Sequence, residues 1–161
     1  MQDNSKDVEV VDIDEEAEPK RSLKILIVED EEDLAELWTE QLGDNHQGDN
    51  VTTFVTAEIA LDFLRRSKRI FDWVITDRGL AWKMDGFGLA EAIKNEHLGG
   101  QPYITMITGK ADEIRANNTD DQLKEKGIDS LLGKPFRKKH LLEMAETVRK
   151  SRSQSEVPLV K

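Results

Sequence analysis

Four stretches of apolar residues in this sequence each end next to side chains that can take part in phosphoryl chemistry. In chain order these end residues are Glu29 and Asp30, then Asp77, then Thr108, and finally Lys134. Carboxylates held close together repel one another, and their pKa values rise unless a cation lies among them. Mg²⁺ is the best candidate, because it binds one or two protein carboxylates, keeps several waters and completes its coordination with phosphate oxygens.

Asp77 is the residue of this set that we predict to react. A carboxylate can act as a nucleophile and form an aspartyl phosphate, while a lysine balances the phosphoryl charge and a threonine hydroxyl donates to a phosphoryl oxygen. The backbone carbonyl of Gly79, two residues further on, is a candidate metal ligand. The alternative is that acidic strand ends are only solvated loops, and matching chemistry at four separate strand ends argues against it. The set therefore predicts metal-assisted phosphoryl transfer to Asp77.

Two kinds of apolar pattern in the sequence predict the strands and helices that position these residues. Runs rich in apolar and β-branched residues predict buried strands at residues 23–28, 51–55, 71–76, 103–108 and 130–132. Helical spacing of apolar residues predicts helices at 34–42, after a capping Thr56, at 89–94, within 112–126 and at 137–149. Strands that alternate with helices predict an α/β fold, in which a parallel sheet is covered on both faces. Such sheets bind ligands beyond the carboxyl ends of their strands, where the candidate site residues fall.

The composition is that of an acidic chain of single-domain size. Its 161 residues include 23 basic and 33 acidic side chains, which give a net charge of −10. Binding to nucleic acid is not expected, because phosphate neutralisation needs clustered lysine and arginine. The absence of cysteine excludes a disulfide framework, a thiolate zinc site and a cysteine nucleophile. The apolar runs are too short to span a bilayer, and no secretory leader opens the chain, so we expect a cytoplasmic protein that does not bind membranes.

The charge is uneven along the chain and indicates its domain organisation. Residues 1–21 hold eight acidic and three basic side chains, half of the net charge. Like-charge repulsion and low aromatic content predict that this N-terminal segment is a disordered tail. Its small apolar patch at residues 8–13 can add as a strand to a sheet edge, although a solvated tail is the favoured interpretation. We expect one folded domain at residues 22–150, followed by a flexible C-terminal tail at residues 151–161.

Five short motifs, in this order, resemble the receiver domains of two-component response regulators. They are Lys24-Ile-Leu-Ile-Val-Glu-Asp-Glu31, Phe71-Asp-Trp-Val-Ile-Thr-Asp77, Met84-Asp-Gly-Phe87, Ile107-Thr-Gly109 and Lys134-Pro-Phe136, and the resemblance covers residues 23–150. It implies a flavodoxin-like, doubly wound five-stranded parallel sheet of order 2-1-3-4-5, with helices on both faces. It also implies a cis peptide bond between Lys134 and Pro135.

The same resemblance implies a role for each candidate site residue. Asp77 is implied to be the phosphoryl acceptor and a ligand of Mg²⁺, together with Asp30, the Gly79 carbonyl and, through a water, Glu29. Thr108 is implied to be the switch hydroxyl, and Lys134 the cation that binds the phosphoryl group. The implied donor is a phosphohistidine on a sensor histidine kinase or a histidine phosphotransfer protein, and the implied output is contact with a downstream protein target. The protein is then no separate enzyme, but a phosphoacceptor that catalyses its own phosphorylation and dephosphorylation.

Three positions depart from the pattern of the resembling family. Ala81 stands where members commonly have proline, and Asp85 follows Asp77 by eight residues, one more than usual. The loop between them is therefore one residue longer and carries an unusual Trp82. Leu131 replaces the aromatic switch residue, and an aliphatic side chain cannot swing a ring between two positions. We therefore expect conformational change to be concentrated in the loop that follows Thr108.

Two alternative functions remain at this stage. A degenerate receiver would bind partners without being phosphorylated; the altered loop favours this hypothesis, and the intact Asp30, Asp77, Thr108 and Lys134 oppose it. A haloacid-dehalogenase-type phosphohydrolase would combine the same kinds of side chain with Mg²⁺. Those enzymes carry the nucleophile in an Asp-x-Asp pair at the first strand, and Glu29-Asp-Glu31 lacks that pair.

Overall fold

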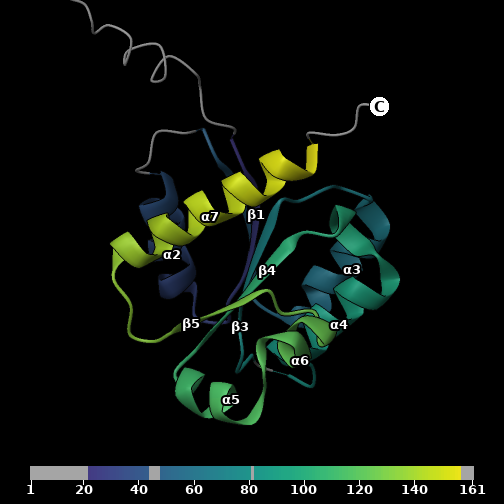
Figure 1. The fold of residues 1–161 in the computed structure, drawn as a ribbon. Coiled ribbons are helices and arrows are strands. Elements are labelled where there is room, and N and C mark those ends of the chain that lie inside the picture. Colours follow the sequence, from purple (N-terminus) through teal and green to yellow (C-terminus); the bar gives the residue numbers. More distant parts are fainter. Residues whose placement is uncertain (1–21, 44–47, 81, 157–161) are drawn as a thin grey trace, which may run out of the picture.

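The computed structural model describes residues 22–43, 48–80 and 82–156, and the predicted acidic tail at residues 1–21 lies outside this range. Its centre is a five-stranded sheet in the order β2-β1-β3-β4-β5, in which all paired strands are parallel. The strands are β1 (Lys24–Val28), β2 (Asn50–Phe54), β3 (Trp73–Asp77), β4 (Tyr103–Thr108) and β5 (Ser130–Gly133). Helices lie on both sides of this sheet (Figure 1). The predicted α/β fold and its strand order are confirmed.

The described helices follow the strands in regular alternation. They are α2 (Glu32–Gly43), α3 (Ala57–Ser67), α4 (Gly86–Glu96), the 3₁₀ helix η2 (Leu98–Gly100), α5 (Ala111–Asn117), α6 (Asp120–Glu125) and α7 (Lys138–Glu156). Thr56 caps α3 as predicted, because its hydroxyl accepts a hydrogen bond from the Ile59 amide at 3.1 Å. None of the described helices combines the length and the apolar character that crossing a membrane requires.

Two helix predictions need correction. The sequence predicts one helix within residues 112–126, but the chain forms two, because Asn118 adopts an extended conformation (φ −143°, ψ 135°). Thr119 then starts α6 through a capping box, in which it exchanges two hydrogen bonds with Gln122. Helix α7 continues to Glu156, so the helix end predicted at residue 149 and the domain boundary predicted at residue 150 come too early. Of the predicted C-terminal tail, only residues 157–161 lie outside the described chain.

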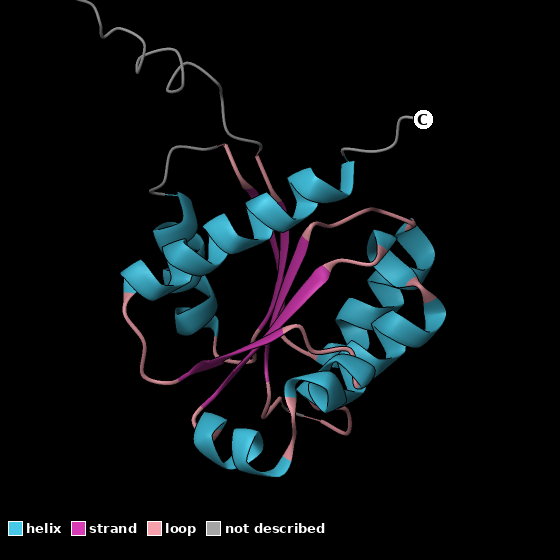
Figure 2. Cartoon of the chain, viewed as in Figure 1, coloured by secondary structure: helices cyan, strands magenta, loops and turns pink. Residues whose placement is uncertain are grey.

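Alternate residues of the central strands face two separate hydrophobic cores. One core joins strand residues such as Leu26 and Val74 to α3 and α4. The other joins Ile25 and Ile75 to α2 and α7. Neighbouring residues of a strand point to opposite faces, so the last four residues of β1, all buried, need a helical layer on each side (Figure 2). Because helices cover both faces of the sheet, polar side chains can reach solvent or a ligand mainly at the ends of the strands.

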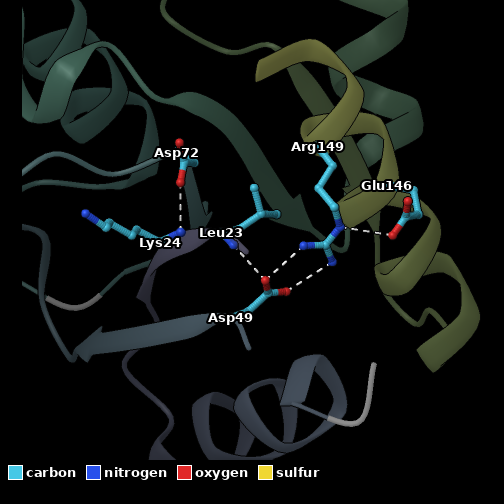
Figure 3. A network of polar contacts seen from close by, with 6 residues as sticks. All are labelled: Leu23, Lys24, Asp49, Asp72, Glu146 and Arg149. Atoms are coloured by element: carbon cyan, nitrogen blue, oxygen red, sulfur yellow. Dashed lines mark hydrogen bonds and ion pairs between the residues drawn. The ribbon is translucent and has the colours of Figure 1, made fainter. Parts of the chain in front are cut away.

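A buried polar network ties the end of α7 to the amino ends of β1 and β2 (Figure 3). Arg149 donates to both carboxylate oxygens of Asp49, at 2.8 and 3.1 Å, and to Glu146 at 3.0 Å. The Leu23 amide donates to Asp49 at 2.7 Å. The Asp49 side chain is fully buried and that of Arg149 is 4% exposed. A buried charge is costly without a partner, so this ion pair holds α7 against the amino edge of the sheet.

Replacing Arg149 with alanine should destabilise the fold strongly, because it leaves the Asp49 carboxylate buried without its guanidinium partner. We expect the free energy of unfolding to fall by about 3–5 kcal/mol, measured by urea denaturation. Arg66→Ala is the matched control, since Arg66 forms an exposed i,i+4 pair with Asp62 and should cost at most about 1 kcal/mol. Equal losses in the two variants would show that the buried pair does not hold α7.

Candidate functional site

Two adjacent strands bring the predicted carboxylates together. Val28 at the end of β1 lies beside Thr76 of β3. The residues that follow them, Glu29 and Asp77, therefore come out at the same edge of the sheet. Oxygen atoms of Glu29, Asp30 and Asp77 all lie within 4.8 Å of one another. Glu29 and Asp77 are buried while Asp30 is more open to solvent, and the three side chains form one acidic pocket.

Lys134 follows β5 and points its ammonium group into the acidic pocket. Its Nζ atom lies 2.7 Å from Asp77 Oδ1 and 3.9 Å from Glu29 Oε1. Its amide donates to the Thr108 carbonyl at 2.8 Å, and its peptide bond to Pro135 is cis, as the resemblance implies. Burial lowers the pKa of Lys134, but the hydrogen bond to Asp77 and the charges of Asp77 and Glu29 outweigh it, so the pKa is raised. The lysine is therefore charged and fixed on Asp77.

Glu29 is an acid whose environment opposes ionisation. Burial is the main reason that the pKa of Glu29 rises from 4.5 to about 7, and the Asp30 side chain and the Asp77 charge raise it further. The Glu31 amide, which donates to Glu29 Oε2 at 3.0 Å, and the Lys134 charge act in the opposite direction. Among the described residues, Glu29 Oε1 has no hydrogen-bond partner.

A divalent cation would relieve these features of the acidic pocket. An unbonded carboxylate oxygen and two further carboxylates are the hard oxygen donors that Mg²⁺ binds, and a cation among them would lower the raised pKa of Glu29. The residues present therefore fit the predicted metal, with Asp30, Asp77 and Glu29 as the groups that would hold it. That Glu29 binds through a water remains a prediction.

Thr108 and Gly79 complete the predicted set. Thr108 ends β4 and is 4% exposed, and its hydroxyl accepts the Lys110 amide at 3.0 Å. The Gly79 amide donates to Asp77 Oδ2 at 3.0 Å, so the backbone here bends back over the acidic pocket. Gly79 contacts Asp77 through its amide, and the role of its carbonyl as a metal ligand remains a prediction. Together with Lys134, Gly79 gives each Asp77 oxygen one hydrogen-bond donor.

Sequence reasoning missed how the long loop after Asp77 is anchored. The Met84 amide donates to Glu58 Oε2 at 2.8 Å, which ties the loop to the start of α3. A Cβ atom at Gly86 would collide with the Asp77 carbonyl oxygen, so the loop approaches the acceptor's backbone closely. Trp82 has φ of 74° and is 80% exposed, and Ala81 lies outside the described residues. The additional residue between Asp77 and Asp85 predicts an altered loop. Nothing in the sequence near Glu58 predicts that its side chain binds this loop.

The fold and the site together define a doubly wound α/β protein with an acidic pocket and a lysine at the carboxyl edge of its sheet. A family model described as response regulator receiver domain matches residues 25–146, and the chain belongs to this family. Receiver domains of this family are components of two-component signalling. The comparison with curated proteins found no match.

Solved receiver structures have the same fold. A CheY-like receiver domain protein from Methanospirillum hungatei is 23% identical, with a TM-score of 0.67 over 83% of this chain and 98% of that one. Chemotaxis response regulator CheY4 of Vibrio cholerae is 24% identical, with a TM-score of 0.66 over 79% of this chain and 98% of that one. NtrX from Brucella abortus is 27% identical, with a TM-score of 0.68 over 87% of this chain but 31% of NtrX. These likenesses confirm the fold.

Removing one carboxylate from the acidic pocket should weaken binding of Mg²⁺. We expect Asp30→Asn to raise the dissociation constant roughly tenfold or more, a loss of the size that supporting residues of metal sites already cause. Isothermal titration calorimetry with MgCl₂ measures this. Glu40→Gln is the matched control, because Glu40 is an exposed acid of α2 and its loss removes the same charge outside the pocket. If Asp30→Asn and the parent chain bind Mg²⁺ equally, Asp30 is not a ligand.

Proposed function

We propose that this chain is a phosphorylation-dependent signalling switch whose Asp77 accepts a phosphoryl group from a phosphohistidine donor. The observation that carries the proposal is the 2.7 Å contact between Lys134 Nζ and Asp77 Oδ1 inside a pocket of three carboxylates. A single cation fixed on one carboxylate distinguishes that residue from its acidic neighbours. With this function the chain would act in the cytoplasm.

The proposed step is an in-line displacement at phosphorus. A carboxylate oxygen of Asp77 forms a bond to phosphorus while the bond from phosphorus to the histidine nitrogen breaks, and its electron pair stays on the imidazole. Hydrogen bonds from the Gly79 amide and Lys134 hold the carboxylate in one orientation before reaction. Lys134 then donates to a phosphoryl oxygen, where negative charge accumulates. The Thr108 hydroxyl, which keeps one donor hydrogen, can donate to a second phosphoryl oxygen.

The carboxylates around Asp77 require a second source of positive charge for this step. A bound Mg²⁺ would supply it by offsetting the negative charge of the phosphoryl group, and Glu29, Asp30 and Asp77 are the residues that would hold the ion. In this proposal the chain catalyses its own phosphorylation, with the phosphohistidine as donor, and its own dephosphorylation, with water as the second reactant.

An apolar groove beside Lys134 supports a protein as the phosphoryl donor. The groove has a volume of about 370 Å³ and is lined chiefly by Leu34, Leu37, Trp38, Pro135 and Phe136. Leu37 is 44% exposed, although it lies on the same helix as the buried Trp38. Lys134 lines the groove as well as the acidic pocket. A sensor histidine kinase or histidine phosphotransfer protein that covers these apolar side chains would place its phosphohistidine next to Asp77.

The contacts of Thr108 support a route from phosphorylation to the protein surface. Its hydroxyl accepts from the amide of Lys110, the residue that caps α5. One and a half turns later, Arg115 Nη2 donates to the Leu131 carbonyl of β5 at 3.1 Å. If the Thr108 hydroxyl turns toward a phosphoryl group, it releases the Lys110 amide and displaces the start of α5. This displacement would strain the hydrogen bond between Arg115 and the Leu131 carbonyl. Downstream protein targets would recognise this altered surface of α5 and β5.

The degenerate-receiver alternative is favoured by one observation, the anchored loop with its exposed Trp82. It predicts the same fold and partner surface without an aspartyl phosphate. The phosphohydrolase alternative has no comparable support, because the acid bonded by Lys134 ends β3 and not β1.

Incubation with acetyl phosphate and Mg²⁺ should yield one phosphoryl adduct, trapped with borohydride and mapped to Asp77 by mass spectrometry. We expect none in Asp77→Asn, and Lys134→Met should slow its formation roughly a hundredfold because one charge-stabilising donor is lost. Asp112→Asn is the matched control, since Asp112 lines a neighbouring surface hollow that also includes Lys134. A chain that folds, binds Mg²⁺ and forms no adduct would establish the degenerate receiver.

Beryllofluoride, which mimics the phosphoryl group, should shift amide resonances of residues 108–116 and of Leu131. The reason is that α5 and β5 are joined by the Arg115 hydrogen bond. Arg115→Met should shrink the shift at Leu131 and leave those near Asp77 intact, as measured by heteronuclear NMR. Glu113→Gln, an exposed change on the same helix, should preserve the whole pattern. Shifts confined to the neighbours of Asp77 in the parent chain would exclude this route.

A further inference from the structure

A second hollow lies at the edge of the sheet opposite the acidic pocket. It has a volume of about 390 Å³ and includes Tyr103 and Ile104, the first residues of β4, whereas Thr108 at the other end of β4 belongs to the candidate site. Its apolar surface includes Ile93 of α4 and Pro102. We call this hollow the amino-edge pocket.

The amino-edge pocket gathers positive charge on an acidic protein. Lys94, Lys124 and Arg152 line it, together with a single carboxylate, Asp129. Asp129 Oδ2 accepts the Ile104 amide at 2.8 Å; burial is the main cause that raises the pKa of Asp129, whereas this hydrogen bond and the charges of Lys124, Arg152 and Lys94 lower it. The three cations outnumber this one carboxylate. The amino-edge pocket is therefore lined by cationic side chains together with the apolar Ile93 and Pro102.

Two of these cations are held in place by backbone carbonyls. Lys94 Nζ donates to the carbonyls of Lys124 and Glu125 at 3.2 and 2.8 Å, which joins α4 to the end of α6. Arg152 Nη1 donates to the Gln101 carbonyl at 3.1 Å, and its Nε lies 3.8 Å from Asp72 Oδ1. The carbonyl groups orient Lys94 without removing its charge, whereas Asp72 offsets part of the charge of Arg152. The arrangement is thus prepared for an acidic ligand with apolar side chains.

A segment of this chain has that chemistry and begins at the same edge. Residues 1–21 carry eight acidic side chains against three basic ones, and six of the acidic side chains lie within residues 8–18, together with Val8, Val10, Val11 and Ile13. The segment leads into β1, which is separated from β4 only by β3, a span of roughly 10 Å at the usual strand spacing. A chain of this length reaches up to about 70 Å when extended, so the pocket is well within range.

We propose that residues 8–18 of this chain bind in the amino-edge pocket, with their carboxylates on Lys94, Lys124 and Arg152 and an apolar side chain against Ile93 and Pro102. The attachment through β1 gives the segment an effective concentration in the millimolar range, so a weak contact suffices to hold it. Attraction between such partly exposed charges weakens as salt rises. This proposal is independent of the function proposed for Asp77.

Paramagnetic relaxation enhancement in the full chain tests this contact. Because the chain has no cysteine, Glu9→Cys provides a single attachment point for a nitroxide. At about 0.01 M salt we expect strong broadening of the amide resonances of residues 101–104 and 151–152, and recovery of these signals in 0.5 M NaCl, where the Debye length is roughly sevenfold shorter. Lys124→Glu should also restore the signals, because it reverses a charge that lines the pocket. Lys139→Glu, the same change on an exposed residue at the other end of α7, should leave the broadening unchanged.

Three results would overturn the proposal. Broadening that avoids residues 101–104, or that persists in Lys124→Glu, would show that the segment does not use the amino-edge pocket. Broadening of an unlabelled, isotope-enriched chain by a separate nitroxide-labelled chain would show that the occupant is a second copy. Each variant is first compared with the parent chain by its amide spectrum, so that a loss of fold is not taken for a loss of contact.

Discussion

Repulsion among three carboxyl groups is the constraint on which the candidate site depends. Parallel strands deliver Glu29, Asp30 and Asp77 to one edge, with oxygens within 4.8 Å of one another. Burial is the main cause of the raised pKa of Glu29, and the Asp30 side chain and the Asp77 charge raise it further. Lys134 compensates only part of the repulsion, because its Nζ is close to Asp77 and 3.9 Å from Glu29. A further positive charge would stabilise this pocket, and a phosphoryl group, which adds negative charge, depends on that positive charge.

Contacts of β4 and α7 together hold the backbone of Lys134 in place. Its amide is bonded to β4, and α7 begins four residues later. Leu141 and Ala145 bury α7 in the core shared with α2, and Arg149 fastens the far end of the helix to Asp49. The same helix therefore links the lysine at one edge of the sheet to a buried ion pair at the other. These contacts fix the backbone of Lys134 relative to the acidic pocket.

The strands and the grouping of the site residues were predictable for one reason: both follow from the positions of apolar runs in the sequence and of the polar residues that come directly after them. Tyr103–Thr108 was predicted to the residue, and a polar residue after a buried parallel strand must lie at the carboxyl edge. The break before Thr119 was not predicted, because residues 112–126 are polar and lack a strong apolar period, although Thr119 and Gln122 have capping-box spacing. The pair of Arg149 with Asp49 joins residues 100 apart and depends on tertiary packing that no local pattern encodes.

The replacement of an aromatic switch residue by Leu131 changes the direction in which a signal can travel. A ring that moves inward couples to the site through the core, whereas Leu131 is buried and aliphatic, and its side chain has no polar group to exchange. Its backbone carbonyl, however, accepts from Arg115 on α5. A hydrogen bond from a charged group contributes about 1.5–3 kcal/mol, which is comparable to the differential interaction that shifts a two-state equilibrium by one or two orders of magnitude. In the proposed route, the contacts from Thr108 through Lys110 and α5 to Arg115 would thus have enough energy to substitute for a ring, and they would alter the surface that a partner contacts.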